Sequence, residues 1–502
     1  MLDNVLYALT HVFDLKIILF MILGVVVGIV VGGMPGLSVT IAVALILPFT
    51  FGMDPALSIL MLLAVYCSGI YGGSIGAILL NTPGTAASAA TAADGFALTQ
   101  KGKTGQALGM SLYASVIAGL LSGVVLLFVA PQIAKFALGF GPPEYFTLAL
   151  FGLTIIAAVS GKSLAKGLVM ACLGILISTV GIDPINGNTR LTFDTMFLMA
   201  GISLIPALLG LFAISEILKQ SQIGINKLSV NGDVDDNGFG WRNVIPFRKT
   251  ILKSSLIGVI IGAIPGTGGS ISSFLAVNEA RRVSKDPDSY GKGNLDGVAA
   301  SEAGNNGTTG ATLIPMMTLG IPGDVVTAVL LGALLIQGLQ PGPQLFQNHG
   351  GLVYTIMIGF ILVNIILFIV AKLAIKQFAK VSRVPASILF PIVLVCCLVG
   401  SFAYDNSMRS VWFALFFGIV GYILPKYGYS VVPMLIGIIL GPLAETSLRR
   451  SLVLSNESLL IFFQRPISLF FIILIVLSLV LPLIKKFRES KEKPDDSISL
   501  PK

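Results

Sequence analysis

Residues 24–36 read Gly-Val-Val-Val-Gly-Ile-Val-Val-Gly-Gly-Met-Pro-Gly, an apolar run that ends in a Pro-Gly pair. The spacing G-x3-G-x2-P-G at residues 28–36 occurs again 230 residues later, at residues 258–266. Proline removes a backbone hydrogen-bond donor and clashes with the preceding helical turn, so each copy predicts a helix that is broken at the same place. The shared spacing predicts an internal duplication of the chain.

Each half of the chain carries a second Pro-Gly pair downstream of the first. Residues 81–84 read Asn-Thr-Pro-Gly, and residues 320–323 read Gly-Ile-Pro-Gly. The number of residues between the two breaks differs between the halves, which indicates divergence by insertion. In the first half, the glycine-rich segment 66–80 is too short to span a bilayer, and residues 85–93 are almost all Ala, Ser and Thr. These segments predict a re-entrant helical hairpin with its tip at residues 81–84.

The composition is that of a membrane protein. Of the 502 residues, 55% are apolar and 11% are charged, whereas a soluble domain carries roughly 25% charged residues. The mean hydropathy is +0.92, and many apolar runs approach the roughly 20 residues that a spanning helix needs. The sequence therefore predicts an all-α integral membrane protein with about 10–12 transmembrane helices, with broken helices and re-entrant hairpins in two internal repeats of inverted topology.

Hydropathy and charge divide the chain into five parts. In residues 1–15, apolar side chains recur at the spacing of one face of a helix. This pattern is typical of a helix that lies on the membrane surface. Clusters of Lys and Arg adjoin the apolar runs, and the positive-inside rule places them in the cytoplasm. The predicted parts are an interfacial amphipathic helix (1–15), a first membrane repeat (16–218), a cytoplasmic linker loop (219–253), a second membrane repeat with C-terminal helices (254–484) and a disordered tail (485–502).

The four helix breaks form the candidate functional site. In lipid an unpaired backbone group costs several kcal/mol, so a break at membrane depth is tolerated only where protein, water or a ligand satisfies it. The N-terminus of the following half-helix attracts an anion, and small polar side chains can bond a carboxylate without filling the site. The predicted substrate-binding residues are Pro35, Gly36, Ser38, Ser74, Asn81, Thr82, Pro83, Gly84, Thr85, Pro265, Gly266, Thr267, Asn305, Asn306, Thr308, Pro322 and Gly323.

The acidic residues and the glycines near the breaks each allow both a structural and a functional interpretation. Asp324 follows the last Pro-Gly pair, and Glu302 precedes the pair Asn305-Asn306. Each acid could serve the fold, as a helix cap does, or help to hold a coupling cation, because buried acids in membrane segments are functional candidates. The glycines within residues 24–32 form a stripe of small side chains, which by itself favours helix packing over a binding site.

The residue pattern excludes several classes of protein. Two Gly-Lys-Ser/Thr triplets, at residues 102–104 and 161–163, lack the upstream glycine of a P-loop, so ATP binding is rejected. The two histidines and four cysteines have no zinc or disulfide spacing, which predicts no metal and no cofactor beyond a coupling cation, sodium or proton. The basic clusters are topology signals and predict no nucleic-acid partner. A channel stays open as an alternative, and an intramembrane aspartyl protease using Asp324 and Asp405 is weakly indicated.

Three motifs resemble one known family. Residues 290–307 read Tyr-Gly-Lys-Gly-Asn-Leu-Asp-Gly-Val-Ala-Ala-Ser-Glu-Ala-Gly-Asn-Asn-Gly. This run is similar to the signature of the large membrane subunit of tripartite tricarboxylate transporters, the TctA family. Residues 72–84 and 32–36 look like the same family, and the resemblance extends from about Gly24 to Pro442.

The resemblance implies the permease subunit of a secondary active transporter and not an enzyme. Such a permease is a multi-pass protein of the bacterial inner membrane that works with a small membrane subunit and a periplasmic solute-binding protein. Its substrates are small organic carboxylates, with citrate as the type case, imported by symport on a sodium or proton gradient. The family's Pro-Gly motifs map onto the four breaks, and its Asn-Asn motif maps onto Asn305 and Asn306. This chain has Ser301 and Gly304 where many members have proline or alanine, which bears on substrate identity.

Overall fold

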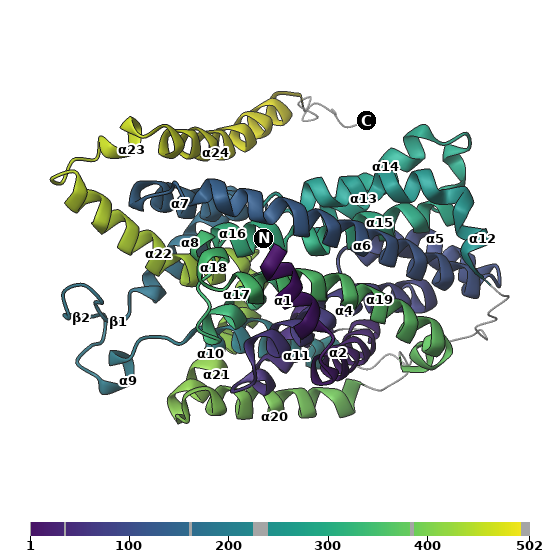
Figure 1. The fold of residues 1–502 in the computed structure, drawn as a ribbon, viewed down its shortest axis with the longest axis horizontal. Helices are drawn as coiled ribbons and strands as arrows, with labels where there is room; N and C mark the ends of the chain where they lie inside the picture. The colour runs from purple at the N-terminus through teal and green to yellow at the C-terminus, as the bar shows by residue number, and fades with distance from the viewer. Residues whose placement is uncertain (1, 35–36, 160–162, 224–238, 382–385, 493–502) are drawn as a thin grey trace, which may run out of the picture. The chain divides into compact units, whose positions relative to one another are not determined.

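The computed structural model describes residues 2–34, 37–159, 163–223, 239–381 and 386–492 (Figure 1). Within these ranges the chain is almost entirely helical, and a short hairpin pairs β1 (Gly181–Ile182) with β2 (Thr189–Arg190). The predicted all-α fold is confirmed.

Packing divides the chain into two compact units. Unit 1 comprises Met1–Gly139 and Ser203–Ile423, and unit 2 comprises Phe140–Ile202 and Leu424–Lys502. Each unit combines residues from both predicted repeats, so the compact units are not the repeats themselves. All four Pro-Gly breaks belong to unit 1.

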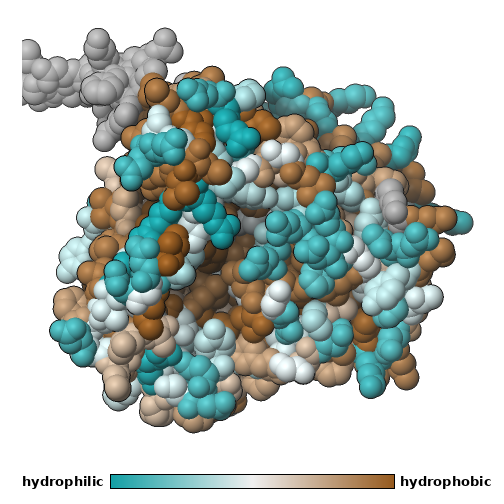
Figure 2. Space-filling model, turned by 60° about the vertical axis from the view of Figure 1, so that its left-hand side comes forward, coloured by the Kyte–Doolittle hydropathy of each residue, from teal (hydrophilic) through white to brown (hydrophobic). Residues whose placement is uncertain are grey.

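Seven helices in the described part of the chain are long and apolar enough to cross a membrane, and six shorter apolar helices of 10–17 residues accompany them. The seven are Leu15–Gly33, Pro55–Leu80, Thr104–Ala137, Leu204–Gln222, Gly350–Ala374, Met408–Lys426 and Val432–Leu454. Large apolar side chains are exposed over much of the face in Figure 2. Such a surface suits a lipid environment, because soluble proteins rarely expose large apolar patches. The chain is a multi-pass membrane protein.

In unit 1, α2 (Leu15–Gly33) packs along α4 (Pro55–Leu80) through the stripe of small residues. A Cβ atom on Gly28 would collide with the hydroxyl group of Ser68, and one on Gly32 would collide with the backbone of α4. The glycines let the two helix backbones approach closely, so the packing interpretation of the stripe is confirmed.

The second half repeats this arrangement with α13 (Arg248–Gly262) and α15 (Leu295–Ala311) (Figure 1). A Cβ atom on Gly258 would lie 2.7 Å from the carbonyl oxygen of Gly304, and one on Gly262 would lie 2.8 Å from the backbone of α15. These two glycines hold the same positions in the repeated motif as the stripe glycines of the first half. The packing therefore agrees with a duplication.

The other helices of unit 1 surround these two pairs. Within the pairs, α15 is enclosed along most of its length, since all residues from Gly297 to Ala311 are buried. The remaining elements are α1 (Leu2–Val12), α3 (Val39–Ile46), η1 (Leu47–Thr50), α5 (Ser88–Gln100), α6 (Thr104–Ala137), α10 (Leu204–Leu208), η2 (Leu209–Ile214), α11 (Ser215–Ile223), α12 (Trp241–Val244), η3 (Ile245–Phe247), α14 (Gly268–Val283), η4 (Pro287–Ser289), α16 (Leu313–Leu319), α17 (Val325–Ile336), α18 (Pro343–Asn348), α19 (Gly350–Val381), α20 (Ala386–Asp405) and most of α21 (Met408–Lys426).

Unit 2 is a smaller helical body with the β hairpin at one end of its helices. An ion-pair network ties the hairpin to α22: Arg449 Nη1 lies 2.8 Å from Asp183 Oδ2, and Arg190 Nη1 lies 2.5 Å from Glu445 Oε1. The helices of this unit are α7 (Pro142–Val159), α8 (Leu164–Ser178), α9 (Met196–Met199), α22 (Val432–Leu454), α23 (Ile461–Gln464) and α24 (Pro466–Glu492).

The first arm of the predicted re-entrant hairpin is longer than the sequence indicated. Residues 66–80 are part of α4, which begins at Pro55 and is long enough to cross a membrane. The Asp54 side chain accepts the N–H groups of Ala56 and Leu57, and proline occupies the first turn, so the start of the helix is well determined. The prediction that residues 66–80 are too short to span is therefore wrong.

Two predicted boundaries also shift in the structure. α24 continues to Glu492, so residues 485–492 are helical and not disordered, in keeping with the helix-forming Lys, Arg and Glu in this stretch. α13 begins at Arg248, inside the predicted linker. Residues 224–238 and 493–502 lie outside the described residues, so the loop and tail interpretations stay predictions there.

Candidate functional site

The second break has the same backbone geometry in both halves. α4 ends at Asn81 and α16 ends at Gly320, and both end residues are left-handed, with φ of 54° and 72°. A left-handed residue is a common way to end a helix, and glycine and asparagine adopt it most readily. In each half a Pro-Gly pair follows, and then a new helix begins.

Similar reciprocal hydrogen bonds precede these new helices. Before α5, the N–H of Ser88 donates to Thr85 Oγ1 at 3.0 Å, and the N–H of Thr85 donates to Ser88 Oγ at 3.1 Å. Before α17, the N–H of Thr327 donates to Asp324 Oδ1 at 2.7 Å, and the N–H of Asp324 donates to Thr327 Oγ1 at 2.8 Å. The pair before α17 is a capping box, whereas the pair before α5 closes the turn that leads into the helix. Asp324 therefore serves as a helix cap, one of the two roles that the sequence left open for it.

Gly84 lies where the second break meets the end of α2. Its N–H donates to the carbonyl oxygen of Gly73 at 3.1 Å, and a Cβ atom on it would collide with the carbonyl oxygen of Gly32, close to the end of α2. Glycine is required here because two backbones approach this closely. Pro35 and Gly36, the first break itself, lie outside the described residues, and their role stays a prediction.

The other predicted residues of the first half differ in their surroundings. Ser38 caps α3, because its hydroxyl accepts the N–H of Ile41 at 3.3 Å. Asn81 and Pro83 are exposed. The hydroxyl of Thr82 is buried and has no hydrogen-bond partner among the described residues. A buried, unpartnered hydroxyl at a helix break can bond a ligand.

Gly266 joins the third break to the fourth. Its N–H donates to the carbonyl oxygen of Gly323 at 2.8 Å. Gly266 and Gly268 have φ of 82° and 63°, which favours glycine at both positions, and a Cβ atom on Gly268 would lie 3.5 Å from Cβ of Asp324. The Thr267 hydroxyl donates back to carbonyl groups near the end of α13. The structure thus brings together the predicted residues Pro265, Gly266, Thr267, Pro322 and Gly323.

Asn305 points at the start of the helix that follows this joined pair. Its side chain is completely buried, and neither its amide nitrogen nor its amide oxygen has a partner among the described residues. A Cβ atom on Gly269, in the first turn of α14, would collide with Asn305 Oδ1. Thr308, one turn further along α15, lies close to the same glycine. Leaving a buried polar group unsatisfied costs about 1–3 kcal/mol, so this amide is a strong candidate for ligand binding.

Tyr66 was not predicted from the sequence, and it links the two halves. Its hydroxyl donates to Asp324 Oδ2 at 2.8 Å and lies 3.3 Å from Thr312 Oγ1. A second link joins Ser273 of α14, whose hydroxyl donates to the carbonyl oxygen of Ala87 at 3.1 Å, just before α5. No sequence pattern marks Tyr66, because it stands in an apolar run like any buried tyrosine.

Glu302 lies at the centre of a separate polar cluster. Its carboxylate accepts hydrogen bonds from Ser74 Oγ at 2.6 Å, from Ser115 Oγ at 2.9 Å and from the hydroxyl of Thr91. These hydroxyl groups come from α4, α6 and α5, so the first half of the chain supplies all three. Thr91 and Ser115 carry no recognisable signal in the sequence, because Ser and Thr are common in membrane helices.

Two residues predicted to bind substrate belong to this cluster instead of the breaks. Ser74 bonds Glu302 directly, and Asn306 Nδ2 donates to Ser115 Oγ at 2.9 Å and to the carbonyl oxygen of Glu302 at 3.1 Å. The pair Asn305-Asn306 therefore divides between two places, because neighbouring residues of a helix point about 100° apart.

A family model matches residues 18–436 of the chain, and its description is the tripartite tricarboxylate transporter TctA family. The chain belongs to this family. The match agrees with the resemblance of the motifs around the breaks and around Glu302.

Two relatives from Agrobacterium vitis are similar to this TctA-family chain. One is an uncharacterised 52.8 kDa protein in the TAR-I ttuC' 3' region, 33% identical over 470 residues, or 92% of each chain. The other is an uncharacterised protein in the TAR-II ttuC' 3' region, 31% identical over 236 residues, which cover 47% of this chain and 98% of the relative. No solved structure matches the chain.

Family membership points to a subunit of a tricarboxylate transporter, and a transporter family implies a protein that is not an enzyme. Its membrane helices agree with that role. Among the described residues, no group of three or more His, Cys, Asp or Glu side chains could hold a metal ion.

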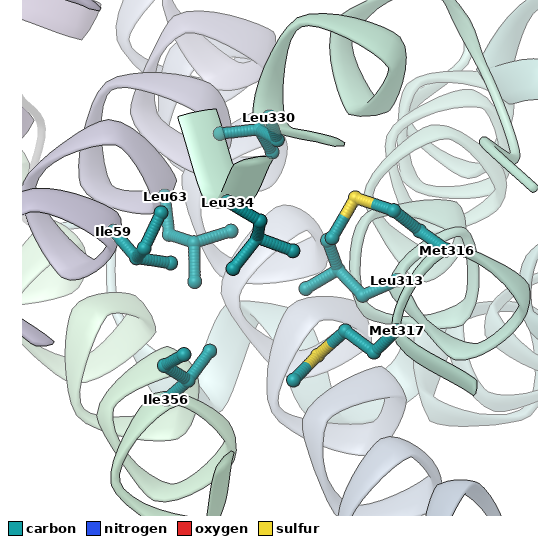
Figure 3. A pocket seen from close by; sticks show the side chains of 8 residues that line it. All are labelled: Ile59, Leu63, Leu313, Met316, Met317, Leu330, Leu334 and Ile356. Carbon is teal, nitrogen blue, oxygen red and sulfur yellow. The ribbon is translucent and has the colours of Figure 1, made fainter. Parts of the chain in front are cut away.

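A small pocket in unit 1 is unsuited to an organic acid. It lies among α4, α16, α17 and α19, and Figure 3 shows only apolar side chains around it. The lining residues are Ile59, Leu63, Leu313, Met316, Met317, Leu330, Leu334 and Ile356. A carboxylate would lose its hydration there without gaining a hydrogen bond.

Proposed function

We propose that this protein is the permease subunit of a secondary active transporter that imports small organic carboxylates across the bacterial inner membrane. The substrate is a tricarboxylate such as citrate, or a related di- or monocarboxylate. The observation that carries the proposal is the buried, unpartnered amide of Asn305, which points at the N-terminus of α14.

A carboxylate suits this place for two reasons. The first turn of α14 offers free N–H groups and a partial positive charge, which stabilise an anion. Gly268 and Gly269 have no side chains to keep a ligand from that backbone, and the Asn305 amide adds a donor in a place that excludes water. Asp324 lies nearby, but its charge is offset by the cap of α17 and by Tyr66.

We propose that both halves of unit 1 contribute to substrate binding. The buried hydroxyl of Thr82 supports a contribution from the first half, and the joined third and fourth breaks support one from the second half. The proposed substrate-binding residues are those predicted from the sequence except Ser74 and Asn306, which belong to the Glu302 cluster. Asn305, Thr308 and the first turn of α14 are at the centre. Pro35 and Gly36 are included on the strength of the repeated motif.

A sodium or proton gradient drives the import in this proposal, with Asp324 or Glu302 as the coupling residue. The tripartite character of the family supports two protein partners, a small membrane subunit and a periplasmic solute-binding protein that delivers the substrate. By analogy with other transporters built from repeats, the part of the chain that carries the breaks moves in an elevator-like manner.

The test is transport by the complete complex in liposomes. The chain is reconstituted with its small membrane subunit and binding protein, and uptake of radiolabelled citrate is followed under an inward sodium gradient, a proton gradient or no gradient. We expect accumulation that requires both a gradient and the binding protein. A panel of di- and monocarboxylates follows if citrate is not taken up.

Two results would contradict the proposal. One is a folded complex that moves no carboxylate under any gradient. The other is rapid flux that needs neither a gradient nor the binding protein, which would identify a channel.

A further inference from the structure

The carboxylate of Glu302 is enclosed by hydroxyl groups from three other helices. Glu302 lies in the middle of α15 and is completely buried. Ser74 Oγ lies 2.6 Å from Oε1, Ser115 Oγ lies 2.9 Å from Oε2, and Thr91 also bonds Oε1. The carboxylate thus connects α15 with α4, α5 and α6.

Of the basic side chains that the structure describes, none forms an ion pair with Glu302. Burying an ionised carboxylate without a counter-ion is very unfavourable, and buried groups take up a proton to avoid it. Acids enclosed in membrane domains in this way serve in proton relays.

The surrounding hydroxyl groups can serve both protonation states. A serine or threonine hydroxyl can donate one hydrogen bond and accept others. When Glu302 is ionised, the three hydroxyls donate to it; when it is protonated, its own O–H donates to one of them. The second layer holds the hydroxyls in place, since Asn306 Nδ2 donates to Ser115 and Ser301 Oγ lies 2.9 Å from Thr91 Oγ1. A proton can therefore bind and leave without rebuilding the cluster.

The distances favour a proton over a metal cation. Oxygen ligands of a hard cation surround it and contact the ion instead of one another. Here the hydroxyl oxygens of Ser74 and Ser115 are in direct hydrogen-bond contact with the Glu302 carboxylate, which leaves no space for an ion between them.

The charged groups around α15 do not compensate for Glu302. The titratable groups set against α15 are Cys67 and Tyr71 of α4 and Asp94 of α5. The helices α13 and α14, which also pack on α15, carry Lys253, and Glu279 and Arg282. Tyr71 interacts electrostatically with Glu302. The Asp94 carboxylate is bonded to backbone N–H groups of the loop before α15, and the last three residues pair with one another. Ser115 and Ser122 of α6 form hydrogen bonds with α15, and both carry uncharged hydroxyl groups.

We propose that Glu302 binds the coupling proton of this transporter, with Ser74, Thr91 and Ser115 as the hydroxyl shell that positions it. The inference rests on the proposed transport function and identifies its driving ion. A proton enters from the side of higher concentration, binds one carboxylate oxygen and leaves on the other side after the transport step. Because the acid belongs to the second half and the shell to the first, proton binding alters the contact between the two halves.

The experiment compares Glu302→Gln with wild type in the complete complex in liposomes, using radiolabelled citrate. Glutamine has the shape of the protonated acid but cannot release a proton. We expect the variant to lose accumulation driven by a pH difference, roughly tenfold for one pH unit and one proton. Exchange of internal for external citrate without a gradient should continue and lose its dependence on pH. Glu279→Gln, at an acid on the polar face of α14 that pairs with Lys253 and Arg282, should accumulate citrate as wild type does.

If Glu302→Gln does not fold, a second variant, Ser74→Ala, tests the same inference. Ser74→Ala removes one donor to the ionised carboxylate, so the pH at which accumulation is half-maximal should rise. A purely structural serine would leave that pH unchanged and lower only the amount of folded protein. An unshifted profile in Ser74→Ala would overturn the inference.

Other outcomes separate this inference from the transport proposal. Wild type that exchanges citrate but accumulates it only on a sodium gradient, with weaker sodium dependence in Glu302→Gln, would make Glu302 a sodium ligand and overturn the proton assignment alone. Accumulation by Glu302→Gln on a pH difference as strong as in wild type would also overturn it. A folded wild-type complex that moves no carboxylate would overturn the transport function, and this inference with it.

Discussion

The phenol of Tyr66 donates a hydrogen bond to the carboxylate of Asp324 at 2.8 Å, and so joins the middle of α4 to the fourth helix break. The other carboxylate oxygen of Asp324 accepts the N–H of Thr327. One acid thus starts α17 and holds it to a helix from the other half of the chain. In the first half, Thr85 makes the corresponding pair of bonds with Ser88, without a charge.

Replacing Tyr66 by phenylalanine should weaken this link without disturbing the packing of the ring. We expect Tyr66→Phe and Asp324→Ala to be non-additive, with a coupling energy of about 1 kcal/mol, in the range measured for hydrogen bonds within membrane proteins. The measurement is a double-mutant cycle on unfolding of the purified protein. Tyr427→Phe, at an exposed tyrosine, is the control and should have no effect. Fully additive effects would show that the bond contributes no stability.

Replacing Asn305 by aspartate should block substrate binding. The new carboxylate would stand at the start of α14 and repel an anion, and the amide donor would be lost. A hydrogen bond to a charged group contributes about 1.5–3 kcal/mol, so the apparent affinity for citrate should fall by roughly 10- to 100-fold or more. Uptake at several citrate concentrations measures this change.

The matched control for this prediction is Asn188→Asp, at an exposed asparagine of the hairpin loop in unit 2. It adds the same charge away from the breaks and should transport as wild type does. Unchanged citrate affinity in a folded Asn305→Asp protein would remove the main argument for a substrate site at α14.

The glycine stripe offers a test of packing within a single helix. Gly28→Ala places a Cβ atom against the Ser68 hydroxyl and should push α2 away from α4, at a cost of about 1–3 kcal/mol. Gly33→Ala, in the same helix, meets its nearest neighbour at 3.5 Å and should be tolerated. Thermal unfolding in detergent compares the two. Equal stability of both variants would contradict the close packing of α2 on α4.

The sequence predicted the class of fold and the location of most breaks for physical reasons. Apolar runs without charge are stable only in lipid, and Pro-Gly pairs end helices wherever they occur. It missed the start of α4 at Pro55, because an apolar run rich in glycine looks weak as a helix although its cap and its burial stabilise it. Such tertiary packing overrides local propensity.

The candidate site was predicted less completely, because it depends on contacts between distant segments. Asn305 was predicted as one of the small polar residues near the breaks, yet its direction toward Gly269 depends on how α14 packs on α15. The shell of Glu302 consists of residues that are ordinary by themselves, such as Thr91 and Ser115. Only the three-dimensional arrangement shows that these hydroxyls meet one carboxylate.

The ion-pair network of unit 2 should respond to acid. The backbone N–H of Ile185 and the guanidinium of Arg449 hold the pKa of Asp183 below its ordinary value of about 3.9. Because its pKa is lower in the folded state, Asp183 contributes its full stability at pH values above its ordinary pKa. This contribution is lost as the pH falls through the pKa of the folded state. The protection of residues 181–202 against hydrogen exchange, taken relative to the intrinsic exchange rate at each pH, should therefore fall below about pH 4. Asp183→Asn should exchange faster already at neutral pH, and an unchanged rate would contradict the role of the network.

Asp324 could act as a helix cap or as a ligand of the coupling ion, and replacing it by asparagine separates these two roles. Asparagine caps a helix as well as aspartate does, so Asp324→Asn should change the free energy of unfolding by only a few tenths of a kcal/mol. If Asp324 acts as a cap and not as a ligand of the coupling ion, this variant should still accumulate citrate on a gradient. Thr327→Val, which removes the reciprocal bond of the capping box, should lower stability by about 1 kcal/mol. A folded Asp324→Asn protein that exchanges citrate without a gradient but no longer accumulates it would assign the coupling ion to Asp324 and away from Glu302.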